Sequence, residues 1–590
     1  MNISAWSIRN PVPALLLFMV LSVLGIHGFR SLTIQQFPDI ELPVVTISAG
    51  LEGASPSQLE TEVTRKIEDA VASLDGIKHI QSTLTDGSSV TAVEFIIDKN
   101  IETALSEVRN AVDSIRADLP GSMTDPTVGK VTTSGNPIVT FTVASERMDE
   151  EALSWFVDNE VSKAMMSVPG VGKSSRIGGV DREVQVNLNP ALMAGLGITA
   201  DAVSQALGQV QKDASGGRGD VGGSVQSVRT LGAVKTADDL AALPIPLAGG
   251  RYVRLDQIAK VQDTYSERST YALWDGKPVV GFQITRVKGA GEVDTADRVR
   301  AAVQKLNEQH PQVSIVEAFD RVTPVKDNYE GSMVLMYEGA ALAILVVWLF
   351  LRDLRSTLVS AIALPLAILP TFAALYYMGY TMNILTLLAL ALVVGVLVDD
   401  AIVEVENIVR HLNMGKTPFQ AAMEAADEIG LAVIATTSTL IAVFLPTAFM
   451  GGVVGKFFEP FGMTAAISVF FSLVVARLLT PMMAAYILKP PKEHKQEDGW
   501  IMTHYLRAMK WCLRHRFITL FLAIAFFIGS IMLIPLLPKG FIPAGDEGVT
   551  GVTVELQPGS TLEETRITAE ATRQLLASTR DQACIFTGWL

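Results

Sequence analysis

Residues 383–409 read NILTLLALALVVGVLVDDAIVEVENIV, and this stretch decides the fold class of the chain. It is apolar over about the 20 residues that a helix needs to cross a bilayer. It also carries two adjacent carboxylates, Asp399 and Asp400. Charge is costly in hydrocarbon, so an intramembrane carboxylate predicts a functional site, usually an ion or proton relay. The stretch therefore predicts a membrane protein and favours an ion-coupled transporter.

Composition agrees with a chain divided between membrane and water. Of its 590 residues, 49% are hydrophobic and 18% are charged. Both values argue against a purely soluble protein. The formal net charge of −14 argues against a nucleic-acid binder, which would present a basic face.

Seven apolar segments are long enough to cross a bilayer. The first follows Arg9 but is longer than a signal-peptide core and lacks a small-residue cleavage site, so an uncleaved helix is predicted. The expected spans are 11–29, 333–351, 357–378, 383–409, 429–450, 461–488 and 517–537.

Basic residues predict the orientation of these spans. They gather between spans two and three, four and five, and six and seven, and the positive-inside rule makes those loops cytoplasmic. The N-terminus is then cytoplasmic, and residues 30–330 and 538–590 are external. The expected organisation is a first transmembrane helix at 1–29, an external region at 30–330, spans two to six at 331–490, a cytoplasmic linker with an interfacial helix at 491–516, span seven at 517–537 and a second external segment at 538–590.

The large external segment alternates strand and helix signals and predicts α+β subdomains of the split β-α-β type. Strands are expected at 44–50, 171–177, 183–188 and 313–319 and a hairpin at 77–97 that turns at Asp86-Gly87; helices are expected at 56–74, 102–119, 150–168, 200–210 and 293–306. Residues 214–225 are rich in glycine and predict a protruding loop.

An internal repeat links the two external segments. FPDIELPVVTISAGLEGASPSQLETEVTRKIEDAVA, from residue 37, is echoed by FIPAGDEGVTGVTVELQPGSTLEETRITAEATRQLLA, from residue 541. The second copy has no match to the hairpin of the first. We therefore expect the first half of a tandem-duplicated transporter followed by a short stub of the second half.

Several motifs resemble the resistance-nodulation-division family, and within it the hydrophobe/amphiphile efflux branch. These motifs are FPDIELPVVTIS at 37–48, GVLVDDAIVEVENI at 395–408, FLPTAFMGG at 444–452 and LLTPMMAAYILKP at 478–490. The resemblance covers the chain to about residue 575. It implies a secondary active transporter and not an enzyme, with an α-helical membrane bundle and periplasmic porter subdomains.

The resemblance also implies how the protein would work. Asp399 and Asp400 match the family's proton-relay acids, so protons would drive export of amphiphilic compounds without a cofactor. The family works as a homotrimer in the inner membrane of Gram-negative bacteria, with a periplasmic adaptor protein, an outer-membrane channel and contact with lipid. The glycine-rich segment at 214–225 occupies the place of its docking loop. Heavy-metal exporters of the family usually carry glycine at the second acidic position, so Asp400 favours the amphiphile branch.

A non-transporting half that serves in assembly is the alternative. The family's basic relay partners lie on spans of the second half, so we expect the 590-residue chain alone not to pump.

Other intramembrane charges accompany the acidic pair. Close carboxylates in a low dielectric cannot easily both ionise, so such a pair can load and release a proton. At about 100° per residue, Glu404 shares the helix face of Asp400, and Glu406 shares that of Asp399. Arg477 interrupts the sixth span, where it needs a partner or a route to the interface. Because their depths overlap, we expect Arg477 to approach Glu404.

The substrate region departs from the drug pumps of this branch. Those pumps line a deep pocket with phenylalanines, whereas the corresponding positions here are Gly135, Asn136 and Ile177. This favours a smaller, lipid-like or more polar substrate. A P-loop at SVPGVGKSS (167–175) is disfavoured, because Ser167 replaces the first glycine and the expected order of helix and strand is reversed.

Overall fold

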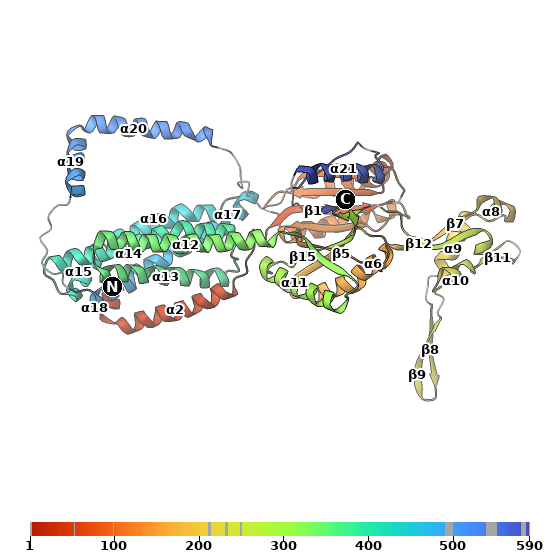
Figure 1. Cartoon of the computed structure of the whole chain (residues 1–590), viewed down its shortest axis with the longest axis horizontal. Helices are drawn as coiled ribbons and strands as arrows, with labels where there is room; N and C mark the ends of the chain where they lie inside the picture. The colour runs from red at the N-terminus through yellow and green to blue at the C-terminus, as the bar shows by residue number, and fades with distance from the viewer. Residues whose placement is uncertain are drawn as a thin grey trace. The chain divides into compact units, whose positions relative to one another are not determined.

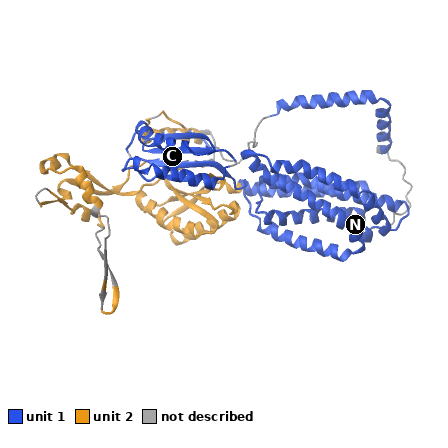
Figure 2. Cartoon of the chain, turned by 180° about the vertical axis from the view of Figure 1, so that it is seen from behind, with its two compact units in different colours: residues 1–130, 324–553 blue, residues 131–323, 554–590 orange. Residues whose placement is uncertain are grey.

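The computed structural model describes residues 3–51, 53–97, 99–210, 214–230, 234–247, 250–268, 270–489, 500–537, 551–557, 559–579 and 586–588. Figure 1 labels its helices and strands. The chain forms two compact units, each built from separated segments (Figure 2). The first contains residues 1–130 and 324–553, and the second contains residues 131–323 and 554–590.

Within the described residues of the first unit, seven helices are long and apolar enough to cross a membrane, which confirms the predicted number. Four begin earlier than expected, at residues 322, 354, 452 and 516, because the residues before the apolar run continue the same helix. The seven are α2 (Pro11–Ser31), α12 (Val322–Leu351), α13 (Leu354–Tyr377), α14 (Ile384–Asn413), α16 (Gly430–Ala448), a continuous helix over Gly452–Ile487, and Arg516–Leu536, which contains α20 (Arg516–Leu533) and η7 (Ile534–Leu536).

The helix over Gly452–Ile487 is not uniform. A π-helical turn, η6 (Val475–Leu479), separates α17 (Gly452–Val474) from α18 (Thr480–Ile487). Arg477 lies in this turn. Single π-helical turns inside α-helices are frequent at functional sites. Shorter helices complete this part of the chain: α1 (Ile3–Arg9), α15 (Pro418–Glu428) and α19 (Trp500–Arg514).

The apolar core of the bundle lies between α13, α14 and α17, and α2 packs closely on α13. Gly25 and Gly28 make the approach of α2 possible, because a Cβ atom at either position would clash with the backbone of α13 at Leu369 or at Phe372 and Ala373. Small residues commonly allow such close contacts between membrane helices. This tight packing fixes the α13 side of the core against which α14 lies.

The first unit also holds a four-stranded sheet with strand order β2-β3-β1-β4. The predicted hairpin turn at Asp86-Gly87 is confirmed, and Gly87 takes the positive φ that the turn requires. Val45, Ile47, Val93 and the apolar faces of two helical segments form its core. The elements are β1 (Glu41–Gly50), α3 (Pro56–Leu59), η1 (Glu60–Thr64), α4 (Arg65–Ala72), β2 (Ile77–Thr85), β3 (Ser88–Phe95), α5 (Ile101–Ser114), η2 (Arg116–Asp118) and β4 (Thr127–Thr132).

The second unit contains another four-stranded sheet, with strand order β16-β5-β15-β6. Its central strands are apolar, and Phe141 stacks on Phe282 across neighbouring strands, with ring centroids 5.2 Å apart. The elements are η3 (Thr133–Gly135), β5 (Pro137–Ala144), α6 (Glu150–Phe156), η4 (Val157–Val161), α7 (Ser162–Met166), β6 (Val171–Ile177), β15 (Val280–Arg286), α11 (Glu292–Gln309) and β16 (Ser314–Asp320).

Smaller sheets in the same unit pair β7 with β12, β10 with β11, and β13 with β14 and β17. Ile245, Leu255 and Ile258 are buried in a separate apolar cluster there. The elements are β7 (Arg182–Leu188), α8 (Pro190–Leu196), α9 (Ala200–Val210), α10 (Ala237–Ala241), β10 (Pro244–Pro246), β11 (Tyr252–Arg254), η5 (Leu255–Gln257), β12 (Ala259–Tyr265), β13 (Ala272–Trp274), β14 (Lys277–Pro278), α21 (Leu562–Thr579) and β17 (Phe586–Gly588).

The glycine-rich segment is a hairpin rather than the expected loop. β8 (Ala214–Val221) pairs antiparallel with β9 (Ser224–Thr230), and Figure 1 shows the two strands as a long ribbon. Gly222 and Gly223 form the turn with φ values of 61° and 84°. Two consecutive positive φ values suit a tight hairpin turn, so the glycines stabilise strand pairing here.

The repeat near residue 541 is only partly visible, because residues 538–550 lie outside the described residues. Residues 551–557 form no strand, whereas α21 takes the place of the helix expected in the second copy.

Candidate functional site

Helix α14 carries the acidic motif, and its N-terminal end is capped. The Asn383 side chain accepts hydrogen bonds from the backbone of Leu385 and Thr386, which caps the helix. Just before it, the Tyr380 hydroxyl lies 3.1 Å from Glu459 Oε1 of α17. Burial, followed by the nearby Glu459 carboxylate, raises the pKa of Tyr380 to about 12. The hydroxyl therefore stays protonated and donates to Glu459.

Asp400 points into the helix bundle. It is half-buried, and its Oδ2 atom accepts a hydrogen bond of 2.7 Å from the Ser472 hydroxyl of α17. The same hydroxyl lies 3.3 Å from the carbonyl oxygen of Leu397, one turn earlier on α14. A serine hydroxyl has one hydrogen to donate and two lone pairs to accept with. Ser472 can therefore serve either acceptor, depending on the state of Asp400.

Asp399 lies on the other side of the helix and is exposed. The two adjacent acids therefore differ in burial within the chain, because consecutive helical residues point about 100° apart. Glu406 is exposed as well. The predicted division of the four acids between two faces is confirmed: Asp400 and Glu404 share one face, and Asp399 and Glu406 share the other.

Glu404 has an exposed fraction of 0% and faces Arg477. Arg477 Nη1 lies 3.8 Å from Glu404 Oε2, so the expected proximity is confirmed. This distance is longer than the 2.7–2.9 Å of a charge-assisted hydrogen bond, and the pair does not form one directly. The guanidinium donates instead to the carbonyl oxygen of Ala426, at 2.8 Å.

Two neighbours shape the position of Arg477. Ala426 lies in the last turn of α15, where backbone carbonyls lack helical partners and a cation is favoured. Gly430, at the start of α16, leaves room for the guanidinium, because a Cβ atom there would lie 2.5 Å from Arg477 Nη2. The Ala426 carbonyl and the space beside Gly430 thus determine the position of the guanidinium.

A polar network surrounds the C-terminal end of α14. His411 Nε2 lies 2.7 Å from Glu428 Oε2, and Arg410 donates to the same carboxylate at 2.5 Å. These hydrogen bonds, from Arg410 first and His411 second, lower the pKa of Glu428 to about 2. Lys416 contacts both His411 and Glu424. The network joins α14 to α15 between Glu404 and the C-terminal end of α14.

The predicted substrate positions belong to the second unit, whereas the acidic site belongs to the first. Gly135 ends the short turn η3, and the backbone N–H of Asn136 lies 3.5 Å from the carbonyl oxygen of Thr133. Ile177 ends β6, opposite Gly281.

A cavity of about 250 Å³ opens beside Arg176, the neighbour of Ile177. Arg176 bonds Asp158 and Asp181 in its wall, and Arg268 also lines it. Gly135, Asn136 and Ile177 are not among its lining residues. The cavity is therefore polar and charged.

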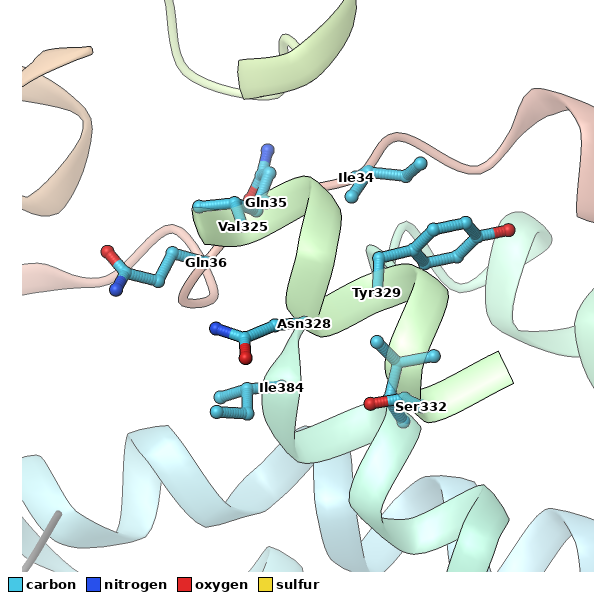
Figure 3. A pocket seen from close by; sticks show the side chains of 9 residues that line it. Ile34, Gln35, Gln36, Val325, Asn328, Tyr329, Ser332 and Ile384 are labelled. Atoms are coloured by element: carbon cyan, nitrogen blue, oxygen red, sulfur yellow. The ribbon is translucent and has the colours of Figure 1, made fainter. Parts of the chain in front are cut away.

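A second pocket belongs to the first unit and is shown in Figure 3. Residues 34–36, the start of α12 and the start of α14 line it, including Gln36, Asn328 and Tyr329. Its space is about 10 Å³. That volume suits a single water molecule and excludes an organic substrate.

Sequence reasoning missed Ser472, Ala426 and Gly430. Ser472 offered a signal, since it is a polar residue in an apolar span, five positions before Arg477. Ala426 acts through its backbone and Gly430 through an absent side chain, so neither gives a signal in the sequence.

Comparisons with known proteins agree with this architecture. The family model for the AcrB/AcrD/AcrF family matches residues 3–588. Multidrug resistance protein MdtC of Pantoea ananatis (strain AJ13355) is 33% identical over 558 residues, covering 93% of this chain and 54% of that protein. MdtC proteins of Klebsiella pneumoniae (strain 342) and Escherichia coli O139:H28 (strain E24377A / ETEC) are each 32% identical over 559 residues, with the same coverage.

The chain spans about half the length of these curated relatives. The family match covers nearly all of the chain, and it includes both the apolar helices and the sheets. The chain therefore belongs to the AcrB/AcrD/AcrF family of resistance-nodulation-division efflux transporters.

Proposed function

We propose that the chain works in proton-driven export of amphiphilic small molecules, with Asp399 and Asp400 as the proton relay. The observation that carries this proposal is the hydrogen bond between Asp400 and Ser472, which joins α14 to α17 inside an apolar bundle. An ionisable group in such surroundings is expensive to maintain unless it serves a function. The multidrug-resistance names of the relatives support the export of drug-like compounds.

Ser472 couples the protonation of Asp400 to the contact between α14 and α17. When Asp400 is ionised it can only accept, so the Ser472 hydroxyl donates to it. When Asp400 is protonated it can donate to Ser472, and the hydroxyl then turns to the carbonyl oxygen of Leu397, 3.3 Å away. Proton binding thus reverses a hydrogen bond between α14 and α17. A reversal of this kind biases the packing of two helices and could drive a change in conformation.

Drug accumulation in cells tests the relay. The protein is expressed from its own chromosomal locus, and Asp400→Asn keeps the size of the side chain while removing its charge. Efflux should be lost while the protein level in the membrane is unchanged. Glu406→Gln, on the exposed face of the same helix, is the matched control and should retain efflux. Normal efflux in the Asp400→Asn cells would refute the relay.

We also propose the family's setting for this chain. The N-terminus would be cytoplasmic in the inner membrane, the sheets would form periplasmic porter subdomains of the split β-α-β type, and the proton-motive force would replace any cofactor. Three copies would assemble with a periplasmic adaptor protein and an outer-membrane channel. The hairpin β8–β9 supports this, since a long two-stranded ribbon is suited to reach a neighbouring subunit.

Cysteine crosslinking tests the role of the hairpin. A cysteine at Gly222, in its turn, should crosslink to a neighbouring subunit in membranes. A cysteine at exposed Leu192 of α8 is the control and should give less of that product. Crosslinks confined to one subunit would contradict intersubunit docking by the hairpin.

The polar cavity beside Arg176 supports a substrate with a charged or polar head group. Its wall contains both arginines and carboxylates. Such a wall binds a ligand with an ionic group more favourably than it binds a flat aromatic ring.

A further inference from the structure

Glu404 is a buried acid that the proposed relay does not use. Its exposed fraction is 0%, and neither of its carboxylate oxygens has a hydrogen-bond partner among the described residues. A buried carboxylate without donors is strongly destabilised when it is ionised. A buried polar group without partners therefore needs an explanation, and a functional change of protonation is one.

Arg477 supplies a charge that does not depend on Glu404. Its Nη1 atom donates to the Ala426 carbonyl at 2.8 Å, at the carboxyl end of α15, where the helix dipole favours a cation. The guanidinium keeps this bond whether Glu404 is ionised or neutral. At 3.8 Å from Nη1, Glu404 Oε2 still feels the positive charge. Glu404 thus has a fixed counter-charge for its ionised form and apolar surroundings for its neutral form.

Few other charges act on Glu404. Among the described residues, its electrostatic partners are Arg477 and, one turn away on α14, Asp400. On α15, Glu428 is paired with Arg410 of α14, and Glu424 is paired with Lys416, which follows α14 in the chain. Asp427 also has a partner. On α13 the only charge is Arg355 in its first turn, on α17 the charges are Lys456 and Glu459 in its first half, and α18 has none.

We propose that Glu404 is a second proton-binding site, with Arg477 as its fixed counter-charge, placed in series with Asp400 along the buried face of α14. The Glu404 carboxylate takes up one proton to become a neutral acid and later releases the same proton. Arg477 stays protonated throughout. The Glu404 site links to transport only through the proposed relay. Proton binding at Glu404 can be tested without transport.

Infrared difference spectroscopy of the full chain in lipid nanodiscs measures this protonation directly. A pH step converts neutral acids to carboxylates, and buried acids give a distinct carbonyl band. Glu404→Gln should lose one such band, while Glu406→Gln should keep it. Asp400→Asn should lose a different band. A wild-type spectrum that contains the Glu404 band but lacks the Asp400 band would contradict the proposed relay at Asp400 and still support proton binding at Glu404.

Arg477→Gln provides a second test, because it removes the cation and keeps a side chain that can donate hydrogen bonds. Removing the cation disfavours the ionised carboxylate, so the Glu404 band should persist to higher pH than in the wild type. An identical spectrum in wild type and Glu404→Gln would overturn the proposal. A Glu404 band with the same pH dependence in Arg477→Gln would overturn the role of Arg477.

Discussion

The two faces of helix α14 carry the same kind of residue in opposite surroundings. On the inward face, Asp400 bonds Ser472 and Glu404 faces Arg477. On the outward face, Asp399 and Glu406 are exposed. Adjacent acids in one motif therefore do not share one environment. The comparison teaches that the rotation of the helix, and not the motif alone, selects which acids a neighbouring helix can influence.

Arg477→Ala should cause the largest loss in the free energy of unfolding, because it acts on the inward face of α14. It leaves Glu404 buried without its cation and the Ala426 carbonyl without its donor. Leaving a buried acceptor without its donor costs about 1–3 kcal/mol, and Glu404 can take up a proton when the cation is removed. Unfolding of the purified protein in detergent measures the loss.

Glu406→Ala is the matched change on the outward face. It should alter the free energy of unfolding by no more than about 0.5 kcal/mol. Equal losses in the two variants would remove the distinction between the faces.

Gly430→Ala should have a smaller effect by displacing the guanidinium without removing its charge. The added Cβ would lie 2.5 Å from Arg477 Nη2, so the side chain must move. The clashing group is the end of a flexible side chain, so the cost should lie at the low end of overpacking, about 1 kcal/mol.

Gly395→Ala is its control, because Gly395 is exposed on α14 and a Cβ there meets nothing within 4 Å. That variant should be neutral or stabilised by up to about 1 kcal/mol. A Gly430→Ala protein as stable as Gly395→Ala would show that Arg477 does not need this space.

Glu428 should give the smallest effect, and it should appear only in acid. Its pKa falls from 4.5 to about 2 in the folded chain, so its contribution is complete above pH 4.5 and is lost as the pH falls toward 2. The wild type should lose thermal stability across this window. Glu428→Gln should show a shallower loss over the same range. Parallel stability curves for the two proteins would contradict the role of the Arg410 and His411 hydrogen bonds.

Much of this arrangement could be predicted from the sequence. Apolar length alone located the seven candidate spans, and helical geometry divided the four acids of α14 between two faces. Depth along the spans paired Arg477 with Glu404. These inferences succeed because they depend on local periodicity and on the high cost of charge in hydrocarbon.

The remaining features depend on tertiary packing. Nothing in the motif shows that Asp399 turns outward, because the rotation of α14 is set by the core that it shares with α13 and α17. The bond from Arg477 to Ala426 uses a backbone carbonyl, and the space beside it comes from Gly430. The glycine-rich segment forms a hairpin because Gly222 and Gly223 make a tight turn and residues 224–230, beyond the glycines, supply the second strand.

Substrate-dependent proton flux tests the central claim most directly, that acids of α14 carry protons and that Asp400, on the inward face, is essential. Inverted membrane vesicles from cells that express the protein from its own locus can report this flux with a pH-sensitive dye. We predict no substrate-dependent flux for Asp400→Asn, reduced flux for Glu404→Gln, and wild-type flux for Glu406→Gln. Wild-type flux in Asp400→Asn would contradict the account.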